Sequence, residues 1–122
     1  MLEWFNAFVW TCAIELPIYM LTLRRTVTRT NVADGSAWRY ARLALGVQCA
    51  THPPFWLFAA WAGPLSTAGI ALAELVITAI EAVLVWRAVG DGRRALVAAI
   101  AANSGSFGLG LALNAWLYGQ AL

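Results

Sequence analysis

Three acidic residues and one histidine lie inside otherwise apolar stretches of this chain, and their types allow them to do chemistry. Glu74 and Glu81 belong to the stretch ALAELVITAIEAVLVWR, which begins at Ala71. Their seven-residue spacing is close to two turns of an α-helix, so both carboxyl groups project from one face. Glu15 and His52 lie in two other apolar stretches. Ionisable groups in such surroundings are costly, which makes these residues candidates for a functional site.

One chemistry that these residue types allow is the binding of a transition metal ion as a cofactor. Cys49 and His52 are three residues apart, as are Cys12 and Glu15, so we expect each pair to share one helical face. Transition metals accept mixed sulfur, nitrogen and oxygen ligands. The candidate metal ligands are His52, Glu74, Glu15, Glu81 and Cys49.

Two further chemistries fit the same residues. Glu and His side chains in series within a membrane are the parts of a proton relay. Acid–base catalysis on a lipophilic substrate would use the same groups, with Phe55, Trp56 and Phe107 lining an opening between helices. No nucleophile elbow, phosphate-binding loop or haem-attachment motif points to a specific enzyme class. Neutral polar residues that would support the site lie in the same apolar stretches: Gln48, Asn103, Ser106 and Asn114.

The composition indicates a membrane protein. Of the 122 residues, 61% are hydrophobic and only 11% are charged, and the mean hydropathy is +0.70. A soluble domain is nearer one half apolar and one quarter charged. The net charge of +2 comes from eight basic residues, all of them Arg, in two short clusters. Nucleic-acid binding is not expected, because it requires a basic face on a folded module.

The hydropathy pattern predicts an all-α integral membrane protein with four transmembrane helices in an up–down bundle. The spans are expected at about residues 2–23, 40–62, 65–89 and 95–118, within one domain covering residues 1–122. Gly63-Pro64 and Gly90-Asp91-Gly92 carry the chemistry of tight turns. Pro53 and Pro54 lack the N–H groups that the carbonyls of Cys49 and Ala50 would accept. We therefore predict a kink in the second helix at these prolines.

The arginines predict the orientation of the chain. All eight lie in or beside two predicted loops, around residues 24–42 and 87–94, and the Gly63-Pro64 turn and both termini have none. By the positive-inside rule the two basic loops are cytoplasmic and both termini lie outside. The expected location is a bacterial-type inner (plasma) membrane.

Residue counting also predicts which polar groups meet. His52 and Glu74 both come out about 14–15 Å from the outer helix ends, at about 1.5 Å per residue. They lie on spans joined by a short turn, so we expect them to face each other, with Glu15 or Asn103 within reach. Two plainer interpretations stay open: Glu81 pairs with an arginine at the cytoplasmic end, and Glu74 is a neutral acid hydrogen-bonded across the bundle.

These observations favour a small inner-membrane protein with a buried His/Glu site that binds or conducts a cation, either a transition metal or a proton. The alternative is a non-catalytic membrane subunit of a larger assembly, whose polar residues bond to partner helices. An intramembrane enzyme acting on a lipophilic substrate is the third interpretation. The expected partners are the lipid bilayer and other membrane subunits or further copies of the chain, because four short helices enclose little volume.

Overall fold

The computed structural model describes residues 2–24 and 37–119, and these residues form four α-helices. The all-helical fold predicted from the hydropathy pattern is thereby confirmed. The helices are α1 (Leu2–Arg24), α2 (Ala37–Ala62), α3 (Thr67–Val89) and α4 (Gly92–Tyr118).

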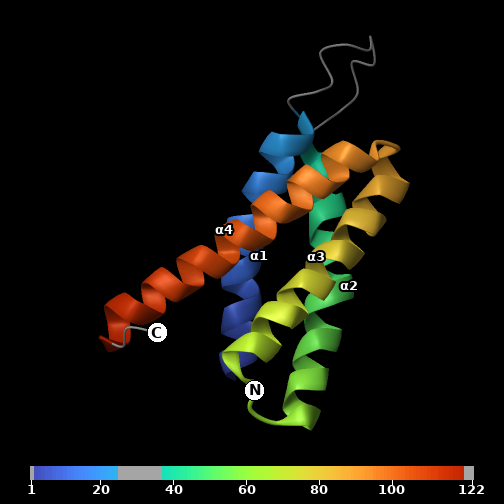
Figure 1. Cartoon of the computed structure of the whole chain (residues 1–122). Coiled ribbons are helices and arrows are strands. Elements are labelled where there is room, and N and C mark those ends of the chain that lie inside the picture. Colours follow the sequence, from blue (N-terminus) through green and yellow to red (C-terminus); the bar gives the residue numbers. More distant parts are fainter. Residues whose placement is uncertain (1, 25–36, 120–122) are drawn as a thin grey trace.

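The helices form a four-helix bundle in which the chain runs up and down (Figure 1). Each helix packs against the next one in sequence, and α4 packs back against α1, so the four make a closed ring. Both chain termini lie at the same end of the bundle as the α2–α3 turn. The α3–α4 turn, the end of α1 and the start of α2 lie at the other end.

Three of the helices are long and apolar enough to cross a membrane: Phe5–Leu23, Ala68–Val89 and Gly92–Leu113. The predicted second span is not among them, within the described part of the chain. Gln48, His52 and the two prolines lower the hydropathy of α2. Gln48 and His52 are buried inside the bundle, so part of the polar character of α2 belongs to the core.

The prolines of α2 do not end the helix. α2 continues from Ala37 to Ala62 with Pro53 and Pro54 inside it. The kink that we predict there stays a prediction. The hydroxyl oxygen of Thr51 lies 3.0 Å from the carbonyl oxygen of Val47 just before the prolines, which adds a side-chain contact to this part of the helix.

Two tight connections set the helix ends. Ser66 is the N-cap of α3 and accepts a hydrogen bond from the backbone N–H of Gly69 (3.1 Å). Gly90 ends α3 in the left-handed region (φ 81°), where glycine is favoured, and its N–H donates to the Trp86 carbonyl. Asp91 then accepts a hydrogen bond from the Arg94 backbone N–H (3.1 Å) at the start of α4.

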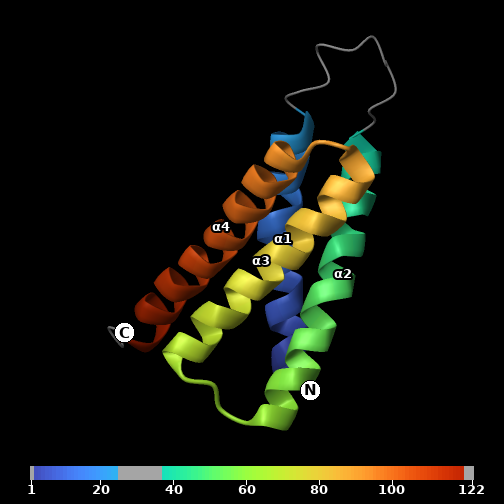
Figure 2. The same cartoon turned by 45° about the vertical axis from the view of Figure 1, so that its right-hand side comes forward.

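The hydrophobic core lies toward one end of the bundle. In the rotated view of Figure 2 this is the end at which the α3–α4 turn lies. Its members come from the last half of α1, the first half of α2, the last half of α3 and the first half of α4. Four alanines give α4 its close approach to the other helices: Ala95, Ala98, Ala99 and Ala102, all fully buried. Five exposed arginines lie on these same helix halves: Arg39, Arg42, Arg87, Arg93 and Arg94. We call this the arginine end.

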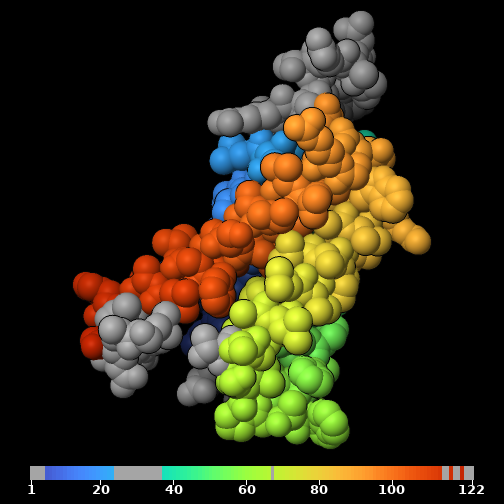
Figure 3. Space-filling view, in the orientation of Figure 1, coloured from blue at the N-terminus to red at the C-terminus, as the bar shows by residue number. Residues whose placement is uncertain are grey.

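The other half of the bundle is more open. In Figures 1 and 3 the C-terminal part of α4 diverges from the hairpin formed by α2 and α3. Large apolar side chains of that half are exposed, including Leu57, Trp61, Leu72 and Trp116. An apolar exposed surface of this extent suits a lipid environment, because apolar patches of such size are uncommon on soluble monomers.

Candidate functional site

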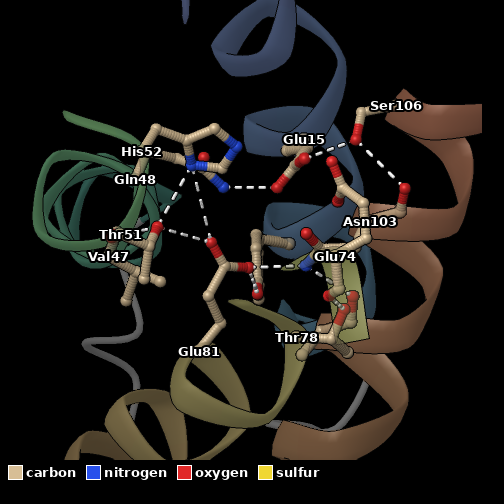
Figure 4. A network of polar contacts seen from close by, with 12 residues as sticks. Glu15, Val47, Gln48, Thr51, His52, Glu74, Thr78, Glu81, Asn103 and Ser106 are labelled. Carbon is tan, nitrogen blue, oxygen red and sulfur yellow. Dashed lines mark hydrogen bonds and ion pairs between the residues drawn. The ribbon is translucent and has the colours of Figure 1, made fainter. Parts of the chain in front are cut away.

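Glu81 is the centre of a buried polar network that joins all four helices (Figure 4). Its side chain is fully buried. Oε2 accepts a hydrogen bond from the Tyr19 hydroxyl of α1 (2.7 Å) and another from Nδ2 of Asn103 on α4 (2.6 Å). Oε1 accepts a hydrogen bond from the hydroxyl of Thr51 on α2 (2.9 Å). Three donors from three neighbouring helices therefore converge on one carboxyl group.

Glu15 is the second buried acid of the network. It is also fully buried, and its Oε1 accepts a hydrogen bond from the hydroxyl of Ser106 (2.5 Å). Its Oε2 accepts a short hydrogen bond from Nε2 of Gln48. Ser106 also contacts the carbonyl of Asn103 (3.1 Å), and Asn103 bonds Glu81, so the two acids belong to one connected set of contacts.

His52 reaches Glu81 both directly and through Thr51. Its Nδ1 lies 3.9 Å from Oε1 of Glu81 and 3.1 Å from the Thr51 hydroxyl oxygen. The His52 side chain is almost completely buried, and its ring lies near that of Phe8, with centroids 6.4 Å apart. The Thr51 hydroxyl thus lies between an imidazole nitrogen and a carboxylate oxygen.

The helical repeat explains why these residues share the core. On α1, Glu15 and Tyr19 are one turn apart, and on α3 Glu81 is flanked one turn away on each side by buried Ile77 and Val85. On α2 the buried face consists of Tyr40, Ala44, Val47, Gln48, Thr51 and His52, which follow the 3.6-residue period.

The electrostatics of the network are unbalanced. Glu15 and Glu81 are two buried acids, and His52 is the one basic group that forms an ion pair with either of them among residues 2–24 and 37–119. Arg42 and Arg94 are exposed, and Arg94 pairs with Asp91 (2.9 Å), so no arginine pairs with Glu81 in this part of the chain. Oε1 of Gln48 and Oδ1 of Asn103 are buried acceptors that receive no hydrogen bond from the described residues.

In the structure His52 lies beside a different acid from the one that residue counting predicted. No hydrogen bond or ion pair joins His52 to Glu74 among the described residues, and the acid beside His52 is Glu81. Residue counting predicted that Glu74 and His52 lie at the same depth in the membrane. In the structure Thr51 of α2 contacts Glu81 of α3, so its neighbour His52 lies near Glu81, which is two turns beyond Glu74.

The five candidate metal ligands do not gather in one place. Cys49 is exposed, although its neighbours Gln48 and His52 are buried. The buried face of α2 is centred between the directions of Gln48 and Thr51, and Cys49 points away from that face. Cys12 is partly buried on α1. In the described ranges, no three His, Cys, Asp or Glu side chains are arranged to hold a metal ion. The side chain of Asn114 lies outside what the structure describes.

Glu74 instead lines a separate apolar cavity of about 850 Å³. The cavity lies between the C-terminal half of α2, the α2–α3 turn and the N-terminal half of α3. Its walls include Phe55 and Trp56, whose ring centroids are 5.7 Å apart. Phe107, the third aromatic residue that an enzyme acting on a lipophilic substrate would place at such an opening, is not in the lining. The Glu74 carboxyl group is partly buried and has no hydrogen-bond partner within the described residues.

Thr51 and Tyr19 were not singled out as site residues by the sequence analysis. The helical period could have identified both residues, because Tyr19 is one turn after Glu15 and Thr51 is three residues after Gln48. A threonine in an apolar helix is usually bonded to its own backbone, and only the neighbouring helix reveals that Thr51 also contacts Glu81.

No protein-family model matches the chain, and neither curated proteins nor solved structures show a significant similarity to it.

Proposed function

We propose that the chain is a four-span membrane protein that binds a proton in its core and transfers it between His52 and Glu81. The observation that carries this proposal is the position of the Thr51 hydroxyl, 3.1 Å from Nδ1 of His52 and 2.9 Å from Oε1 of Glu81. A hydroxyl group both donates and accepts hydrogen bonds, so it can link a proton donor to a proton acceptor.

Two coupled proton movements make up the transfer, and the number of protons stays the same. Protonated His52 donates its Nδ1 proton to the Thr51 oxygen while the Thr51 hydroxyl proton moves to Oε1 of Glu81. The imidazole and the carboxyl group are then both neutral, and Thr51 is again a hydroxyl. The reverse transfer restores the ion pair. Distances of 2.6–3.2 Å between heavy atoms are those over which such transfers take place.

The charge count of the core supports a bound proton. Burying an unpaired charge at this depth costs at least about 2.5 kcal/mol. Two carboxylates and one histidine leave a net negative charge even when His52 is protonated, so neutrality requires one further cation. A proton satisfies that requirement on Glu15 or Glu81 without the set of three or more ligands that a transition metal needs and that the described residues lack.

The proposal includes an orientation in the membrane. The five arginines of the arginine end would face the cytoplasm, and both termini and the cavity would lie toward the outside. The arginines of the segment 25–36 lie outside the described residues. Glu81, in the last half of α3, then lies in the cytoplasmic half of the bundle.

Proton flux into liposomes tests the proposal. Purified protein is reconstituted with a pH-sensitive dye inside the vesicles, and a potassium diffusion potential drives protons inward. We expect the wild type to acidify the interior faster than protein-free liposomes, and Glu81→Gln to remove the difference. Asp91→Asn is the matched control, because it removes one carboxylate at the exposed α3–α4 turn. Flux equal to that of empty liposomes, or unchanged in Glu81→Gln, contradicts the proposal.

Elemental analysis separates a proton from a metal. Protein purified without added metal is expected to carry no transition metal in a stoichiometric amount. One metal ion per chain that is lost in Glu81→Gln would favour the metal interpretation over the proton.

A further inference from the structure

We infer that the cavity beside Glu74 binds a lipophilic organic cation, a molecule with a bulky apolar body and one delocalised positive charge. This inference goes beyond the proposed proton transfer and does not depend on it. It stands on the shape and the lining of the cavity and on one carboxyl group.

The size of the cavity fits a small organic molecule. Its volume of about 850 Å³ lies within the range of about 300–1,000 Å³ that is typical of sites for drug-sized ligands. Aliphatic and aromatic side chains make up most of its walls, among them Pro53, Leu57, Leu65 and Ile70. Such a lining excludes small hydrated ions, because it offers them no replacement for water.

Glu74 gives the cavity its selectivity for charge. Among the described residues that line this cavity, it is the one charged residue. The hydroxyl of Thr78 donates a hydrogen bond to the backbone carbonyl of Glu74 (2.7 Å), and within the described residues no hydrogen bond or ion pair engages the Glu74 carboxyl group. In this respect it differs from Glu15 and Glu81, whose oxygens all accept hydrogen bonds. A carboxylate in a low-dielectric wall attracts a cation strongly.

The aromatic residues favour a cation in which charge and apolar surface are combined. Phe55 and Trp56 lie side by side in the wall, with their rings tilted by 57°. The faces of such rings attract cations, Trp most strongly, and their area is also apolar. An anion of the same shape would meet the carboxylate and the negative ring faces, and would be excluded.

Equilibrium binding of radiolabelled tetraphenylphosphonium tests the inference. The chain is placed in nanodiscs of neutral lipid, and binding to empty nanodiscs is subtracted. We expect saturable binding of one cation per chain. Glu74→Gln is expected to weaken the affinity by about tenfold or more, since it keeps the size of the side chain and removes its charge. Tetraphenylborate, which has the same shape and the opposite charge, is expected not to compete.

Two control variants keep the test independent of folding. Asp91→Asn removes a carboxylate far from the cavity and is expected to bind as the wild type does. Trp56→Ala is expected to weaken binding, and Trp61→Ala, which alters an exposed tryptophan outside the lining, is not. Equal binding by wild type and Glu74→Gln, competition by tetraphenylborate, or equal effects of the two tryptophan variants would each overturn the inference.

Discussion

Oε1 of Glu81 on α3 and Nδ1 of His52 on α2 lie 3.9 Å apart, with the hydroxyl of Thr51 in contact with both. This arrangement connects a fully buried acid to the histidine that directly precedes Pro53, a residue of the cavity wall. The buried network and the cavity therefore adjoin each other along α2, although they use different acids.

Glu81 is expected to stabilise the bundle more than Glu74 does. Glu81→Leu removes the acceptor of three interhelical hydrogen bonds, which are worth about 0.6 kcal/mol each in membrane proteins, for a loss of about 2 kcal/mol. Glu74→Leu, on the same helix and two turns away, removes a carboxyl group without a hydrogen bond and is expected to leave stability unchanged or higher. Unfolding by SDS in mixed micelles measures both. Equal losses would show that the network does not stabilise the fold.

Thr51 is expected to be a positioning and relay residue with a specific requirement for a hydroxyl group. Thr51→Val keeps the branched shape and removes the oxygen between His52 and Glu81, so we expect the proton flux to fall to the rate of protein-free liposomes. Thr51→Ser restores the hydroxyl and is expected to restore most of the flux. If Thr51→Val conducts as well as Thr51→Ser, protons do not pass through this residue.

The arginine end is expected to face the cytoplasm. In a variant without Cys12 and Cys49, a new cysteine at Gly92 should be protected from a membrane-impermeant thiol reagent in intact cells, and one at Ala62 should react. Both positions are exposed in the structure. Gly92 can accept a side chain, because its nearest neighbours, atoms of Trp86, are at ordinary contact distance (3.6 Å). The opposite labelling pattern would reverse the orientation.

Gly105 is expected to be required for the close packing of α4 on α1. A Cβ atom added at Gly105 would lie 2.8 Å from Cδ1 of Ile18, while one added at Gly108 meets nothing within 4 Å. Gly105→Leu should therefore cost about 1–3 kcal/mol, the usual range for overpacking, and Gly108→Leu should cost much less. Combining Gly105→Leu with Ile18→Ala is expected to recover part of the loss. Thermal unfolding in detergent gives all three values, and equal effects at the two glycines would contradict the packing.

The sequence by itself determined the helical fold and most of the buried polar residues, although it missed Thr51 and included the exposed Cys49. Hydropathy and the residues that start and end helices act within short segments of the chain. The four helices and the turns at Gly63-Pro64 and Gly90-Asp91-Gly92 therefore follow from the local sequence. The burial of Glu15, Glu81 and His52 also follows, since an apolar helix with one polar stripe turns that stripe inward.

Only the tertiary structure decided which of these residues meet. Glu74 and Glu81 share a helix face, and the choice between them as the partner of His52 depends on the rotation and axial shift of α2 against α3. Residue counting fixes neither quantity, because helices are free to slide and turn until their side chains pack. The buried alanines of α4 pack in the half of the bundle that holds the arginine end. Glu81 is enclosed by hydrogen bonds, and Glu74, two turns away on the same helix, lies beside a cavity.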